Sequence, residues 1–149
     1  MIVNSDNYAS NILNGLMDIN IYKKIFEDIG IENYNTEDQY RKLSSTQIAK
    51  LFRILYNSTY LSYNNSEYAL LLLSESGFKG GLVKEFPASV VVAHKFGEGG
   101  GVDETDLSDA GIVYLNNETY CIVVMTRGKN VTELSEIIGK ISKKIYDYF

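Results

Sequence analysis

The chain has 149 residues, of which 45% are hydrophobic and 22% are charged, and its formal net charge is −5. These values are ordinary for one globular domain and exclude a disordered or collagen-like chain. The acidic balance argues against non-specific nucleic-acid binding, which needs clustered lysine and arginine side chains to neutralise phosphates.

Apolar residues at helical spacing predict helices through the first half of the chain. Ser5, Asp6 or Asn7 would cap the first helix, because each side chain can accept a hydrogen bond from its free amides. Gly30 would end the second helix. The predicted helices cover residues 6–17, 21–30, 44–57 and 66–76, with a polar loop over residues 31–43.

After Pro87, the only proline, the pattern changes to that of β-strands. Segments rich in valine, isoleucine and tyrosine predict strands over residues 89–96, 110–115 and 119–126. Asn116 and Asn117 favour a hairpin between the last two strands, and the glycine-rich segment 97–109 links the first two. A long amphipathic helix closes the chain, with apolar residues from Leu134 to Ile145 on one side.

The predicted fold class is therefore α+β. A mostly helical part over residues 1–87 precedes an antiparallel three-stranded meander and a C-terminal packing helix over residues 88–149.

Cysteine and histidine each occur once, and neither indicates a site. Cys121 has no partner for an internal disulfide, and its apolar segment predicts a buried, inert thiol. His94 has no second histidine or cysteine with which to share a metal, so we expect no metal and no other cofactor. The first residues lack the basic start and apolar stretch of a signal peptide, and no segment is apolar enough to span a membrane.

Two short motifs about ninety residues apart carry the candidate site. Ser-Asp-Asn occupies residues 5–7 within "MIVNSDNYASN", and Lys-Phe-Gly occupies residues 95–97 within "VVVAHKFGEGGG". Each motif alone is a weak signal, since the first can simply cap a helix and Lys95 can simply face solvent.

In this order the motifs resemble those of class A β-lactamases and related penicillin-binding serine hydrolases. The second motif is similar to their Lys-Thr-Gly strand, and "DAGIVYLNNETYCIVVMTRG" resembles the two strands that follow it. The stretches "LSSTQIAKLFRILYNSTYLS" and "LLLSESGFKGGLVKEFP" match the region between the motifs. The resemblance covers essentially the whole chain and corresponds to the C-terminal part of that fold.

The resemblance implies serine acyl-transfer chemistry on a β-lactam or on a cell-wall peptide ending in D-alanine. Ser5 would relay a proton to the leaving nitrogen, and Lys95 would hold Ser5 and place positive charge opposite the substrate carboxylate. Asn7 would bond the substrate's amide side chain. Gly97 would keep the strand edge open for substrate, and the backbone amide of Glu98 would supply one oxyanion donor. The residues of this chain alone leave its compartment open, and the family resemblance suggests an exported or extracellular bacterial protein.

The chain departs from the family pattern at three places. The nucleophile belongs in a Ser-x-x-Lys turn before Ser-Asp-Asn, yet the one such tetrapeptide, at residues 76–79, falls where we expect an ordinary loop. Phe96 stands where threonine or serine would donate a hydrogen bond to the substrate carboxylate. The glutamate segment that activates water for deacylation is missing, and we expect Glu37 and Asp38 to be solvated loop residues. An acyl-enzyme would then accumulate, as in a penicillin-binding protein.

We therefore expect one β-lactamase-like domain over residues 1–149, incomplete at its N-terminus and inactive alone. Absence of the central helix and two strands of the family fold would leave apolar faces open to water. This predicts a complementing N-terminal segment or self-association. A non-catalytic module that binds β-lactams or cell-wall peptides, and a folded product without present function, are the alternatives.

Overall fold

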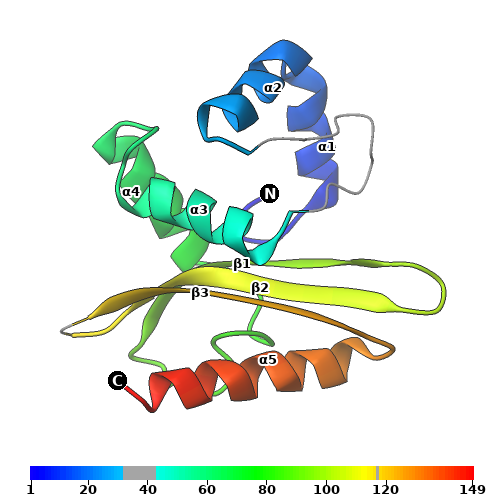
Figure 1. The fold of residues 1–149 in the computed structure, drawn as a ribbon, viewed down its shortest axis with the longest axis vertical. Coiled ribbons are helices and arrows are strands. Elements are labelled where there is room, and N and C mark those ends of the chain that lie inside the picture. The colour runs from blue at the N-terminus through cyan, green and yellow to red at the C-terminus, as the bar shows by residue number, and fades with distance from the viewer. Residues whose placement is uncertain (32–42, 117) are drawn as a thin grey trace.

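The computed structural model describes residues 1–31, 43–116 and 118–149, and these form three layers (Figure 1). A β-sheet lies between helices from the first half of the chain and one long helix from its end. This arrangement confirms the predicted α+β fold. The helices are α1 (Asn7–Leu16), α2 (Ile19–Asp28), α3 (Ser45–Tyr56), α4 (Tyr63–Ser74) and α5 (Val131–Tyr146), and the strands are β1 (Val91–Gly100), β2 (Thr105–Tyr114) and β3 (Thr119–Gly128).

Side-chain caps account for where the helices begin. Asp6 caps α1 by accepting a hydrogen bond from the Ala9 amide at 3.0 Å. Ser44 and Gln47 form the predicted capping box of α3. Helix α4 begins earlier than predicted, because Ser62 already caps it.

The sheet is antiparallel in the order β1-β2-β3. Strand β1 is longer than predicted and continues through Gly97–Gly100, which pair with Thr105–Ser108 of β2. Backbone hydrogen bonds form this extension, so the apolar pattern of the sequence does not mark it. Strand β1 thus reaches the glycine-rich segment that was predicted to be a link.

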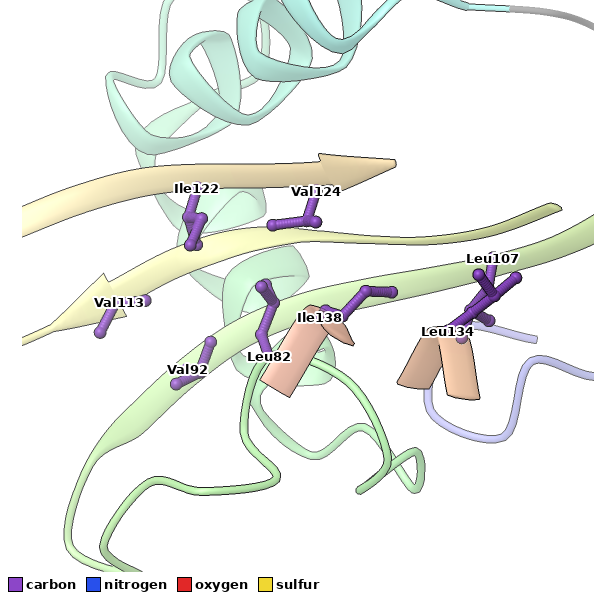
Figure 2. Packing of buried hydrophobic residues seen from close by; sticks show 8 residues of the cluster. All are labelled: Leu82, Val92, Leu107, Val113, Ile122, Val124, Leu134 and Ile138. Atoms are coloured by element: carbon purple, nitrogen blue, oxygen red, sulfur yellow. The ribbon is translucent and has the colours of Figure 1, made fainter. Parts of the chain in front are cut away.

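Both faces of the sheet are buried against helices. Figure 2 shows the cluster between the sheet and α5, and a second cluster lies between the sheet and helices α3 and α4. The α5 cluster consists of Leu82, Val92, Leu107, Val113, Ile122, Val124, Leu134 and Ile138. The second cluster consists of Phe52, Leu70, Leu73, Ala93, Ala110 and Ile112. Strand residues alternate between the two clusters, as the two-residue period of a β-strand requires.

Helices α1 and α2 contain no buried residue. The apolar side chains that predicted α1 remain accessible to solvent, with Leu16 79% exposed. The others in this set are Ile12, Leu13 and Met17. In the part of the chain that the structure describes, no helix has the length and apolar character needed to cross a membrane.

Candidate active site

A turn at the N-terminus places Ser5 beside the sheet. The Asp6 amide donates to the Met1 carbonyl at 3.3 Å, and the Gly77 amide donates to the Val3 carbonyl at 2.9 Å. Ser5 itself has φ of +50°, a left-handed conformation that is uncommon for a residue with a side chain. The turn and this conformation direct the Ser5 hydroxyl toward β1.

Lys95 of β1 meets that hydroxyl. Its Nζ donates to Ser5 Oγ at 2.5 Å and to the Phe96 carbonyl at 2.7 Å. The side chain is half-buried, and burial lowers the pKa of Lys95, while the negative charge of Asp109 acts in the opposite direction. A lysine with a lowered pKa gives up its proton more readily than one in open solvent.

The Phe96 ring contacts both Phe78 and Lys95. It stacks on Phe78, with ring centroids 4.0 Å apart and an interplanar angle of 22°. Lys95 Nζ lies 4.4 Å from the centroid of the same ring. The ring therefore packs where the family has a hydroxyl, and it cannot donate a hydrogen bond.

All six predicted site residues line one pocket of about 880 Å³. They are Ser5, Asn7, Lys95, Phe96, Gly97 and Glu98. Asn7 is the first residue of α1, and the other wall is formed by β1, an edge strand of the sheet. The structure thus brings the two motifs together, at the end of β1 that the glycines extend.

The Ser-x-x-Lys tetrapeptide is not part of this pocket. Ser76 is 2% exposed in the loop after α4, where its Oγ accepts a hydrogen bond from the Phe78 amide at 3.4 Å. Lys79 is exposed and forms no part of the pocket wall. Glu37, Asp38 and the hairpin residue Asn117 lie outside the described residues.

The prediction that Cys121 is buried was wrong, because its side chain is exposed. That its thiol is inert stays a prediction. It lies on β3 at a groove of about 490 Å³ between α3 and the sheet. An apolar strand segment does not bury every side chain when the strand lies at an edge of the sheet.

Asp109 was not among the predicted site residues; it is fully buried on β2 and bonded to His94. Alternation along β2 could have revealed it, since Asp109 shares a strand face with the core residues Leu107 and Val113. In the described part of the chain, no three histidine, cysteine, aspartate or glutamate side chains are grouped to hold a metal ion.

Comparisons with known proteins identify the family of this chain. The profile of the Beta-lactamase enzyme family matches residues 1–149. The chain belongs to this family. A comparison with curated proteins finds no similar sequence.

Several solved structures share the fold of this β-lactamase-family chain. The class A β-lactamase from Bacteroides cellulosilyticus is 23% identical, with a TM-score of 0.83 over 96% of this chain and 58% of that chain. A β-lactamase from Chitinophaga pinensis is 28% identical, with a TM-score of 0.64 over 69% of this chain and 40% of that one. PBP-A is 21% identical, with a TM-score of 0.71 over 85% of this chain and 49% of that chain. The chain therefore spans about two fifths to three fifths of the length of these structures.

Proposed function

We propose that this chain provides the proton-relay and substrate-strand part of a serine acyl-transfer site, for a β-lactam or a cell-wall peptide ending in D-alanine. The observation that carries this proposal is the 2.5 Å hydrogen bond from Lys95 Nζ to Ser5 Oγ, which joins residues ninety positions apart. Both side chains open onto the pocket that also holds Asn7 and the end of β1.

The geometry supports a specific proton path. Ser5 Oγ accepts from Lys95 and keeps its own hydrogen for a group in the pocket. Ser5 would give that proton to the leaving nitrogen, while Lys95 gives a proton to Ser5 Oγ. The lowered pKa of Lys95 favours the second transfer. The substrate would lie along the open edge of β1, with its carboxylate near the Lys95 charge.

We propose that the chain is inactive alone and needs a complementing segment that bears the nucleophile. The only Ser-x-x-Lys of the sequence contributes no residue to the pocket, and the chain spans 58% of a class A β-lactamase that it matches with a TM-score of 0.83. The exposed apolar residues of α1 offer such a segment a surface. Sedimentation should show association with that segment or, failing that, with a second copy. A stable monomer at micromolar concentration in its presence would contradict this proposal.

A second candidate is a module that binds without reacting, and the absence of a nucleophile among the described pocket residues favours it. Penicillin G is the appropriate probe, because a PBP-A variant among the similar structures is an acyl-enzyme complex with this compound.

Intact-mass spectrometry after incubation with penicillin G tests the proposed function. We expect no mass gain, and an adduct mapped to Ser76 or Ser5 would overturn the proposed roles. Titration of the ¹⁵N-labelled chain with penicillin G then tests binding. Binding that Lys95→Met abolishes and Lys79→Met leaves intact would support the pocket, because Lys79 lies outside it. Equal binding by both variants would place the ligand elsewhere.

A further inference from the structure

A buried pair, His94 and Asp109, lies beside the candidate site and takes no part in the proton path described above. The two side chains are 1% and 0% exposed. His94 Nδ1 lies 3.0 Å from one carboxylate oxygen of Asp109 and 3.1 Å from the other. Since an ionised carboxylate only accepts, Nδ1 carries the hydrogen of this bond.

The surrounding chain makes room for the pair and holds it. The Leu82 amide donates to Asp109 Oδ2 at 2.9 Å. A Cβ on Gly81 would collide with the Asp109 carboxylate, and one on Gly111 would lie 2.7 Å from His94 Cβ. Burying a charged group costs free energy unless hydrogen bonds compensate, so a carboxylate with two donors, and with a glycine beside each member of the pair, is a built feature.

The register of the sheet places this carboxylate next to Lys95. His94 precedes Lys95 on β1, and Asp109 precedes Ala110, the residue paired with Lys95 on β2. Side chains alternate along the strands, so those of His94 and Asp109 lie on the α5 face of the sheet, and that of Lys95 leaves β1 on the opposite face.

Among the residues that the structure describes, the other charged groups lining the pocket with Lys95 are exposed. The Met1 amine, Asp6 and Glu98 line the same pocket as Lys95, and α4 contributes the apolar Leu73 to it. Water and salt screen charges at such exposed positions. Asp109 is different because it is excluded from water, where an interaction between charges is much stronger.

We propose that Asp109, oriented by His94 and the Leu82 amide, is a positioning residue whose buried carboxylate holds Lys95 as a cation beside Ser5. The proposal deepens the proposed function, because it assigns a role at the same site. It agrees with the opposing influences on Lys95, whose pKa burial lowers and the charge of Asp109 raises.

The test follows the ionisation of Lys95 by NMR in a chain with ¹³C- and ¹⁵N-labelled lysine. Lys95→Met removes the Lys95 signal and so assigns it. We expect Asp109→Asn to lower the titration midpoint of Lys95. His94→Asn keeps the carboxylate and a donor to it, so we expect a smaller change. Asp106→Asn is the matched control, because Asp106 is an exposed acid of β2 paired with Arg127.

The outcomes separate a positioning role from a purely structural one. An unchanged Lys95 midpoint in folded Asp109→Asn, or an equal shift in His94→Asn, would overturn the proposal. Asp109→Ser is a second neutral variant that keeps an acceptor for the Leu82 amide. If both neutral variants fail to fold while His94→Asn folds, Asp109 is a structural residue and the proposal is wrong. No substrate is present in this titration, so its result is independent of whether the chain binds a β-lactam.

Discussion

Substitution of Phe96 tests both the packing of the site and its substrate preference. Threonine and valine have nearly the same shape, and either would remove the ring that stacks on Phe78. Only threonine restores the hydroxyl that the family places opposite a substrate carboxylate. Phe96→Thr and Phe96→Val therefore form a matched pair, in which the valine variant reports the loss of the ring alone.

The structure sets the size of the expected changes. A stacked aromatic pair contributes roughly 0.5–1.5 kcal/mol. The contact with the Lys95 ammonium adds about 0.5–1 kcal/mol. Lost burial of a half-buried ring adds about 1 kcal/mol. Both variants should therefore lose about 2–3.5 kcal/mol of unfolding free energy. A hydrogen bond to a carboxylate contributes about 1.5 kcal/mol or more, so threonine should bind penicillin G roughly tenfold more tightly than valine.

Urea unfolding followed by circular dichroism measures the stability loss, and NMR titration with penicillin G measures affinity. Phe78→Leu serves as a control, since it breaks the same stack without altering β1. A loss below about 1 kcal/mol in both Phe96 variants would show that the ring is not packed as described. Equal penicillin affinity in the threonine and valine variants would refute the role of this position in carboxylate recognition.

Three further predictions concern the residues around the site. Ser5→Ala should lower the unfolding free energy by about 0.5–1.5 kcal/mol, because it removes the hydrogen bond to Lys95. Ser5→Gly should lower it less, because glycine tolerates the φ of +50°. Urea unfolding that finds Ser5→Gly less stable than Ser5→Ala would contradict this. Burial lowers the pKa of Lys95, although the negative charge of Asp109 raises it, so just below the ordinary pKa of 10.5 the unfolded chain binds more protons than the folded chain. The unfolding free energy of the wild type, measured relative to Lys95→Met, should therefore rise as the pH approaches 10.5. A stability difference between the two proteins that does not change with pH would contradict this burial. Gly111→Ala should lower the unfolding free energy by about 1–3 kcal/mol or prevent folding, because its Cβ would lie 2.7 Å from the Ala93 carbonyl. Thermal unfolding measures the loss, and Gly99→Ala is the control, because a Cβ at Gly99 would meet open space.

Helices α3, α4 and α5 and the strands could be predicted because each buries one or two faces, and burial leaves a period in the sequence. Helices α1 and α2 show the helical period although neither contains a buried residue. The α3 capping box and helix α5 are both found where the sequence indicated, although Ile137 and Ile141 of the predicted apolar stripe are exposed. The ends of elements were less certain. Strand β1 extends to Gly100 through backbone pairing, which glycine permits but which leaves no strand pattern in the sequence.

The candidate site could be predicted only from resemblance. The contact between Ser5 and Lys95 joins distant segments, and no local period encodes such a contact. Asp109 was missed because the sequence placed it in the glycine-rich link 97–109. It lies instead on β2, where a histidine, a backbone amide and the space beside Gly81 accommodate it inside.

The absence of buried residues in α1 and α2 has a consequence for how the site opens and closes. Native proteins unfold locally in cooperative units, and a unit that buries little apolar surface opens at low free energy. Opening of the N-terminal turn with α1 would break the Val3–Gly77 and Ser5–Lys95 hydrogen bonds but leave the buried residues of both clusters in place. Amide hydrogen exchange in α1 should accordingly be faster than in β2. Ser5 belongs to the unit that opens easily, whereas Lys95 belongs to the stable sheet. The Ser5–Lys95 hydrogen bond should therefore form and break in equilibrium, and a molecule that binds α1 in its docked position favours the closed state.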